Sequence, residues 1–311
     1  RVAHDYMAAR VWSAPIALAN YAVLGSLIGR GRTDLGLAAQ IAINLANIAL
    51  SLLFVARFDW GVVGVAWASV IAEAVGLVLG MLFQARAGLF HRPRWAAIFD
   101  RALMWRTLAV NRDIFLRTLA LIAAIAFFTR RGAQSGDVVL AANAVLHNLF
   151  LIGSFFLDGF ATATETTSGQ AVGARDRKGF SEAVRIGAIW CMGFGLAATL
   201  LAFFGGGSLI DFISTSVEVR TTARDYLWFA ALTPLAGALA FLFDGVFIGA
   251  TWTRAMRNTM AIALAIAALA YWLATPWGNA GLWTAFLVFL VTRGAAQAAF
   301  YPSLLRGAFP R

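Results

Sequence analysis

Four carboxylates lie inside stretches that are otherwise apolar: Glu73, Asp158, Glu165 and Asp244. An ionisable side chain inside a membrane costs at least a few kcal/mol, so it indicates a functional site. Asp158 and Glu165 are two helical turns apart and therefore share one helix face. Such a carboxylate could carry a proton between membrane faces or bind Na⁺ or a cationic substrate. The alternative for each is an interhelical hydrogen bond or an ion pair, with Arg117, Arg254 and Arg257 as candidate partners.

Three asparagines occupy similar apolar stretches: Asn44, Asn47 and Asn143. Asn44 and Asn47 are one helical turn apart, so they share a face. Amides at this depth either hold helices together or line a polar cavity, and both interpretations stay open. His147 has no second His, Cys or carboxylate at a metal-ligand spacing, so we expect no metal site.

The stretches that position these residues are long and apolar. Of 311 residues, 61% are hydrophobic and 13% are charged, against about 25% charged in a soluble domain. This composition excludes a disordered chain, a collagen and an ordinary cytosolic enzyme. About 20 apolar residues cross a bilayer as a helix, which predicts an all-α polytopic membrane protein. Nine transmembrane helices are expected, at residues 11–29, 36–56, 61–84, 113–129, 138–164, 181–205, 226–249, 256–275 and 278–303.

Basic residues gather in the loops on one side of these spans, and six of them fall between Arg86 and Arg112. The positive-inside rule places those loops in the cytoplasm, the N-terminus outside and the C-terminus inside. Residues 95–112 are too polar to span and predict an amphipathic helix on the cytoplasmic surface. This linker divides the chain into residues 1–94, 95–112 and 113–311.

The two halves carry a weak internal repeat. Asp5-Tyr6, Gly25 and Gly29 recur at one offset as Asp225-Tyr226, Gly245 and Gly249. Repeats of this kind build many secondary transporters, with a site between the halves. The second copy has three helices before its Asp-Tyr pair and the first has none, so we expect three further helices upstream and a complete arrangement of six plus six.

Several motifs resemble the multidrug and toxic compound extrusion (MATE) transporters. The N-terminal part carries Gly29-Arg-Gly-Arg-Thr33 and Asn44-x-x-Asn47-Ile, which resemble helices four and five of that family. The stretches Ala141-Ala-Asn-Ala-Val145, Leu157-Asp-Gly-Phe-Ala161 and Gly169-Gln170 to Asp176 resemble its DinF-like branch, as does Asp244-Gly-Val-Phe-Ile-Gly-Ala250. Residues 1–94 then match the second half of an N-lobe (helices four to six), and residues 113–311 match a C-lobe (helices seven to twelve).

The resemblance implies a V-shaped pair of six-helix lobes around a central cavity. It also implies export of small cationic or amphipathic compounds by antiport with H⁺ or Na⁺, through alternating access, in a multi-pass protein of the bacterial plasma (inner) membrane. Asp244 falls on the tenth helix of that scheme, where the family often has an acid. The first-helix Asp of the DinF-like branch has no counterpart here, and neither has the seventh-helix Glu of another branch.

The sequence also bears on other classes of function. Gly169 to Asp176 lacks the ending of a phosphate-binding loop, and no catalytic or dinucleotide motif is present, so we expect no enzyme, no cofactor and an ion gradient as energy source. The expected partners are the substrates and the lipid bilayer, with no nucleic acid, and the protein is expected to be a monomer. Two alternatives stay open: a lipid-linked sugar flippase, which would need arginines in mid-membrane, and a non-transporting fragment.

Overall fold

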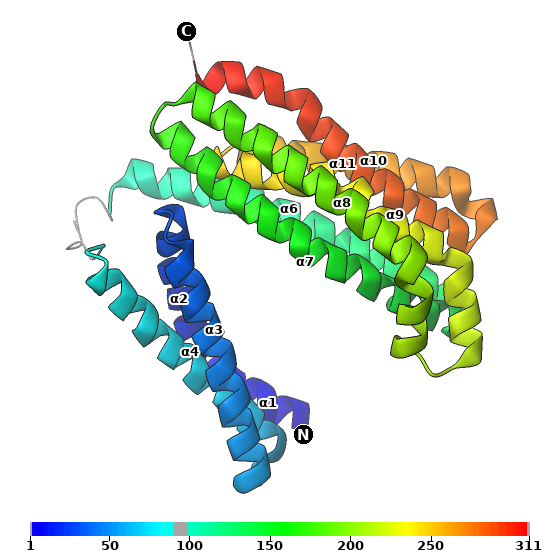
Figure 1. The fold of residues 1–311 in the computed structure, drawn as a ribbon, viewed down its shortest axis with the longest axis horizontal. Helices are drawn as coiled ribbons and strands as arrows, with labels where there is room; N and C mark the ends of the chain where they lie inside the picture. The colour runs from blue at the N-terminus through cyan, green and yellow to red at the C-terminus, as the bar shows by residue number, and fades with distance from the viewer. Residues whose placement is uncertain (1, 90–98, 310–311) are drawn as a thin grey trace. The chain divides into compact units, whose positions relative to one another are not determined.

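The computed structural model describes residues 2–89 and 99–309, and these form helices joined by short turns, with no strand (Figure 1). Its elements are α1 (Val2–Val11), α2 (Ala14–Gly29), α3 (Thr33–Leu52), a π-helical turn η1 (Leu53–Arg57), α4 (Gly61–Arg86), α6 (Arg101–Gln134), α7 (Asp137–Gly173), α8 (Arg177–Ile213), α9 (Val217–Gly249), α10 (Thr253–Ala274), a 3₁₀ turn η2 (Thr275–Trp277) and α11 (Asn279–Ala308).

The all-α membrane fold is confirmed, with one difference in the number of spans. Seven helices of the described chain are long and apolar enough to cross a membrane: α3 with η1, α4, α7, α8, α9, α10 with η2, and α11. The predicted span 11–29 is instead divided between α1 and the 16-residue α2, because the chain breaks at Trp12–Ser13 and Pro15 begins the new helix. The predicted span 113–129 lies within α6, where Arg112, Asp113 and Arg117 interrupt the apolar run.

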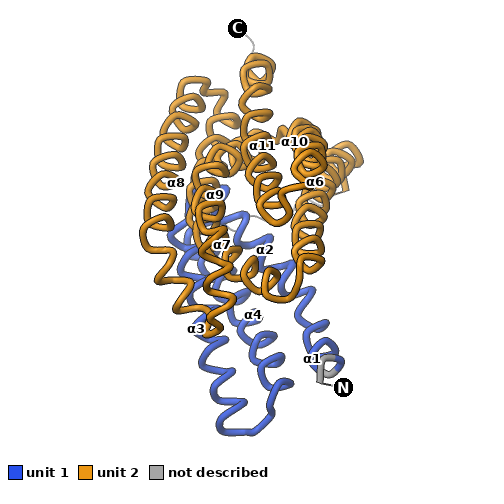
Figure 2. The backbone as a smooth tube through the Cα atoms, turned by 90° about the vertical axis from the view of Figure 1, so that its right-hand side faces the viewer, with its two compact units in different colours: residues 1–95 blue, residues 96–311 orange. Residues whose placement is uncertain are grey.

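The chain divides into two compact units, residues 1–95 and residues 96–311 (Figure 2). We call them unit 1 and unit 2. Residues 101–112 of the predicted linker are helical, and they continue without a break into the following segment as the single helix α6. Asp100 begins this helix by accepting hydrogen bonds from the amides of Ala102 and Leu103. Residues 95–98 of the predicted linker lie outside the described residues.

Unit 1 is built around α4, which contacts α1, α2 and α3. Small residues face these contacts: Ala66, Ala68 and Ala72 are fully buried on α4. Small side chains let helix backbones approach closely in a membrane. A Cβ atom at Gly76 would collide with the side chain of Ile43 on α3, so this glycine allows the close α3–α4 contact.

Unit 2 is built around α9, which contacts α7, α8 and α11. The first core cluster includes Trp283, Phe286 and Phe128, and the second includes Phe180 and Phe247. Helix α9 approaches α7 closely where glycines replace side chains. A Cβ at Gly245 would collide with the carbonyl of Ala161, and one at Gly249 would collide with the carbonyl of Glu165.

Substituting Gly245 by alanine is therefore expected to separate α7 from α9 and to destabilise the protein by about 1–3 kcal/mol, as overpacking does. Thermal unfolding in detergent measures the effect. Gly159→Ala on α7 is the matched control, since open space surrounds that position, and alanine in a helix there should stabilise by roughly 0.5–1 kcal/mol. Equal melting temperatures for the two variants would contradict the close contact.

Candidate functional site

A buried charge cluster in unit 2 is centred on Asp244 of α9, whose side chain is only 10% exposed. Its Oδ2 accepts hydrogen bonds from the guanidinium groups of Arg117 on α6 and Arg293 on α11. Its Oδ1 accepts a hydrogen bond of 2.9 Å from the side-chain amide of Gln297. Three helices thus converge on one carboxylate, and this carboxylate is an ion-pair centre, not a lone buried acid.

The local sequence explains why these partners meet. Arg293 and Gln297 are one turn apart on α11, so both side chains lie on the same face. Gly294 lies between them, and a Cβ there would collide with the backbone of Ala240 on α9. The glycine therefore lets α11 approach α9 closely enough for both donors to contact Asp244.

Two further carboxylates on α7 belong to the same cluster. Asp158 interacts electrostatically with Arg117, with Arg293 and with Glu165. Asp158 is exposed and Glu165 is half-buried. Within the described chain neither carboxylate forms a hydrogen bond or an ion pair. The structure thus places Asp158 near the two arginines that pair with Asp244, and Glu165 interacts with Asp158.

This cluster carries a net negative charge that a bound cation would neutralise. With all groups ionised, the three carboxylates carry one more charge than the two guanidinium groups of Arg117 and Arg293. An uncompensated negative charge inside a membrane is costly, and a bound proton or metal cation would remove it. A cation at Asp158 or Glu165 would neutralise this charge without displacing the partners of Asp244.

Of the three arginines considered as partners of Asp244, only Arg117 contacts it among the described residues. Arg257 instead donates to Asp113 on α6 over 2.7 Å. Arg112 also contacts Asp113, at 3.2 Å. This bridge joins the beginning of α10 to α6 and is separate from the Asp244 contacts.

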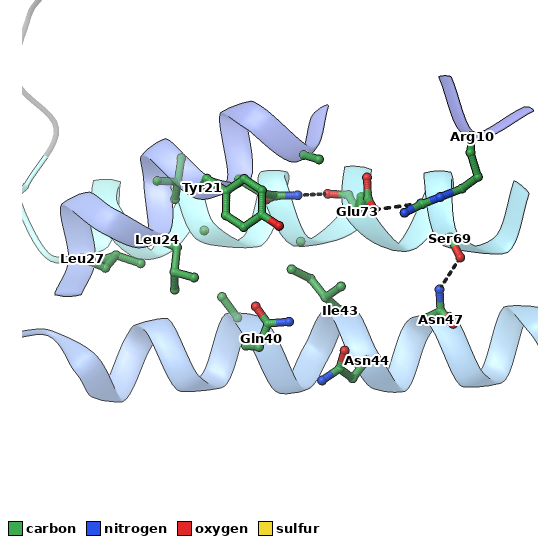
Figure 3. A pocket seen from close by; sticks show the side chains of 16 residues that line it. Arg10, Tyr21, Leu24, Leu27, Gln40, Ile43, Asn44, Asn47, Ser69 and Glu73 are labelled. Atoms are coloured by element: carbon green, nitrogen blue, oxygen red, sulfur yellow. Dashed lines mark hydrogen bonds and ion pairs between the residues drawn. The ribbon is translucent and has the colours of Figure 1, made fainter. Parts of the chain in front are cut away.

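A second polar site lies in unit 1, in a cavity of about 250 Å³ between α2, α3 and α4 (Figure 3). The predicted residues Glu73, Asn44 and Asn47 all line it, together with Arg10 and Tyr21. Asn44 and Asn47 come from α3 and Glu73 comes from α4, so the structure brings these three together across a helix contact. Asn44 is exposed and Asn47 is half-buried.

Glu73 is the acidic group of this cavity, with a side chain 18% exposed. One carboxylate oxygen, Oε1, accepts a hydrogen bond of 2.9 Å from Arg10 (Figure 3). The other, Oε2, is buried and has no hydrogen-bond partner among the described residues. The Asn20 side chain donates to the backbone carbonyl of Glu73 over 2.7 Å, which fixes this turn of α4. The free oxygen leaves one ligand position for a small cation or a proton.

The two asparagines of α3 differ in role. The Asn47 amide donates to the Ser69 hydroxyl over 2.8 Å and so joins α3 to α4. Asn44 makes no side-chain hydrogen bond within the described chain and only lines the cavity. The contacts of Asn47 thus favour the helix-joining interpretation, and the position of Asn44 favours the cavity-lining one.

Asn143 lies apart from both sites, in a closed hydrogen-bond network. Its amide nitrogen donates to Asn279 over 2.8 Å, and its oxygen accepts from Asn279 at 3.0 Å and from the Trp283 indole at 2.9 Å. Asn143 is 3% exposed. This geometry favours the helix-joining interpretation, since it binds α7 to α11 and uses three of the amide's hydrogen-bonding positions.

Substituting Asn143 by leucine should lower the melting temperature, because it leaves the buried Asn279 amide and the Trp283 N–H unpaired. Each such group costs about 1–3 kcal/mol. Asn148→Leu on the same helix is the control, since Asn148 is exposed and should change stability by at most about 0.5 kcal/mol. Equal melting temperatures for the two variants would show that the network contributes nothing.

Sequence reasoning missed several members of both sites: Arg10, Asn20, Arg293 and Gln297. Arg293 had a usable signal, because it lies midway along the apolar stretch 278–303 and an intramembrane arginine is as costly as an acid. Arg10 had no such signal, since it lies near the end of a short helix. Within the described residues no group of three His, Cys, Asp or Glu side chains could hold a metal ion.

Comparison with known proteins assigns the family. The sequence model named MatE matches residues 115–273, just over half of the chain. The chain belongs to the MatE family. It is 36% identical to DNA damage-inducible protein F of Escherichia coli (strain K12) over 310 residues, which cover 96% of this chain and 66% of that protein. It is 26% identical to Protein DETOXIFICATION 44, chloroplastic, of Arabidopsis thaliana, covering 95% of this chain and 56% of that protein.

Solved MATE structures share the fold of this MatE protein. The Vibrio cholerae MATE transporter VcmN in its bent form aligns with a TM-score of 0.84 at 22% identity, covering 97% of this chain and 69% of that chain. A MATE protein in its straight conformation aligns with a TM-score of 0.88 at 16% identity, covering 98% and 70%. The resemblance to the MATE family and its DinF-like branch is thereby confirmed. The chain spans about half to two thirds of the length of the curated relatives it matches.

Proposed function

We propose that this MatE protein exports small cationic or amphipathic compounds by antiport with H⁺ or Na⁺, through alternating access between its two halves. Membership in a transporter family supports this proposal, and the names of its plant relatives refer to detoxification. The seven apolar helices support an integral membrane protein, and the bacterial relative supports the plasma (inner) membrane as its location. The proposed partners are the substrates and the bilayer, for a monomeric protein that uses no cofactor, catalyses no reaction and binds no nucleic acid.

The proposal rests on two acids of unit 2: Asp244, which is paired with two arginines, and Asp158, which forms no ion pair within the described chain. Arg117, Arg293 and Gln297 occupy the oxygens of Asp244, so we assign Asp244 a positioning role. Asp158 is exposed and its carboxylate forms no hydrogen bond or ion pair within the described chain, so we assign it the exchange of the cation, with Glu165 two turns away as its neighbour. Binding a cation there changes the charge of the cluster, and a cation can shift a conformational equilibrium only through such a difference in binding.

Glu73 is the proposed second cation site, in unit 1. Its cavity of about 250 Å³ is smaller than the roughly 300–1,000 Å³ of most drug-sized pockets. The free carboxylate oxygen in a cavity of this size fits a proton or a small cation better than a drug. A cationic substrate and a coupling ion would then use different groups.

The decisive experiment measures dye export from cells of an efflux-deficient bacterial strain that express the complete gene product. Cells loaded with a cationic dye are energised, and dye loss is followed with the H⁺ gradient collapsed by an uncoupler or with Na⁺ omitted. Export that stops in one of these two conditions identifies the coupling ion. Dye loss equal to that of cells without the protein, at matched expression, would overturn the proposed function.

A further inference from the structure

A second pocket lies wholly within unit 2, at the end of the helix pair α10–α11 where η2 joins them. It has a volume of about 580 Å³, well within the size range of small-molecule sites. Helices α6, α10 and α11 form its walls. The wall is mostly apolar, and its aromatic members are Phe127, Phe128, Tyr271, Trp272, Phe286 and Phe289.

One cation lies at the edge of this pocket. The guanidinium of Arg131 lies 5.3 Å from the ring centre of Phe127 and 5.5 Å from that of Tyr271. Its Nη1 donates a hydrogen bond of 2.9 Å to the neutral side chain of Gln134. No carboxylate of the described chain forms an ion pair with Arg131. The aromatic rings therefore lie against a positive charge that has no ion-pair partner in the part of the chain that the structure describes.

The exposed tryptophans indicate the depth of this pocket in the membrane. Trp272 is 71% exposed and Trp277 is 66% exposed, both close to the turn that ends α10. Exposed tryptophans of membrane proteins concentrate at the level of the lipid headgroups. Arg131 then lies at headgroup level, at the last turn of α6, while Ala124 and Phe289 continue the pocket towards the hydrocarbon region.

We propose that this pocket binds an acidic phospholipid, with an acyl chain against the aromatic wall and the phosphate paired with Arg131. The apolar wall suits the chain, and a guanidinium without a counter-charge suits the phosphate. The positive charge of Arg131 disfavours a cationic compound here, so this site is separate from the cation sites at Asp158 and Glu73.

The test measures lipid binding by native mass spectrometry of the delipidated protein in detergent, with phosphatidylglycerol, phosphatidylcholine or glycerol phosphate added. The expected order is phosphatidylglycerol bound most tightly, phosphatidylcholine more weakly and glycerol phosphate not at all. Arg131→Gln should weaken phosphatidylglycerol binding about fivefold, to the level of phosphatidylcholine, since one arginine contributes on that order to acidic-lipid binding. Arg130→Gln is the matched control, because the exposed Arg130 is next in sequence and does not line the pocket.

A second variant tests the acyl-chain part. Ala267→Phe adds a ring inside the pocket and should reduce the binding of both phospholipids, and thermal unfolding establishes that the variant is folded. If it does not fold, the Arg131 and Arg130 pair alone decides the proposal. The proposal is overturned if Arg131→Gln keeps its preference for phosphatidylglycerol, if Arg130→Gln loses it equally, or if glycerol phosphate binds as well as the lipid.

Discussion

Substituting Asp158 by asparagine should reduce substrate-coupled cation movement by about tenfold or more, at least about 1.4 kcal/mol of barrier. The amide keeps the size and hydrogen-bonding capacity of the side chain but neither takes up a proton nor attracts a cation. Because Asp158 is exposed and its carboxylate forms no hydrogen bond or ion pair within the described chain, the protein should fold as before. Transport is measured with the complete gene product in proteoliposomes, and thermal unfolding is measured on the same preparation.

Asp137→Asn provides the matched control for Asp158. Asp137 is an exposed carboxylate at the beginning of the same helix, α7, outside the charge cluster. Its loss should leave transport unchanged. Transport at the wild-type rate by Asp158→Asn, or an equal loss in both variants, would contradict the role assigned to Asp158.

Substituting Asp244 by alanine should destabilise the protein by about 3–5 kcal/mol, since removing one partner of a buried ion pair leaves charge uncompensated. Here two guanidinium groups, those of Arg117 and Arg293, lose their shared acceptor. The expected result is a large fall in melting temperature in detergent and low yield of folded protein. Asp244 therefore affects transport through the fold, in addition to any direct effect.

Two further variants separate the loss of the buried ion pairs from a general sensitivity of the protein to the removal of an acidic residue. Asp211→Ala removes an acid whose side chain is 42% exposed and pairs with Arg224 near the α8–α9 turn, and such surface pairs contribute about 0–1 kcal/mol. Asp244→Leu combined with Arg117→Met and Arg293→Met removes all three members of this ion-pair group together and should recover part of the stability lost in Asp244→Ala without recovering transport. A mild effect of Asp244→Ala alone would show that the ion pairs do not hold the helices.

The composition and the long apolar stretches were sufficient to predict an all-α membrane fold, because a membrane helix depends on a sustained apolar run. The same criterion placed seven of the nine predicted spans on helices of the described chain that are long and apolar enough to cross a membrane. It could not detect the break at Ser13, which depends on a proline within an apolar stretch, or the continuity of α6 through Arg112 and Asp113. A continuous helix through charged residues depends on partners from elsewhere in the chain, here Arg257, and a local window does not include them.

The candidate site shows the same limit. Helical spacing predicted that Asp158 and Glu165 share a face, because that relation is local. It did not predict that Arg293 and Gln297 of α11 occupy the oxygens of Asp244, since this depends on Gly294 allowing two helices to approach. The contacts that these two residues make with Asp244 also distinguish it from Asp158 and Glu165, which form no ion pair within the described chain. Which carboxylates exchange a cation stays a prediction for experiment.

The most direct test records substrate and cation movement in the same proteoliposomes. The complete gene product is reconstituted, a pH or Na⁺ gradient is imposed, and a cationic dye and the internal pH or Na⁺ are followed together. We predict that one gradient drives the dye in the direction opposite to the cation, and that Asp158→Asn slows both movements about tenfold or more while Asp137→Asn keeps them. Dye movement that ignores both gradients, or that keeps its wild-type rate in Asp158→Asn, would contradict cation-coupled export through the unit 2 cluster.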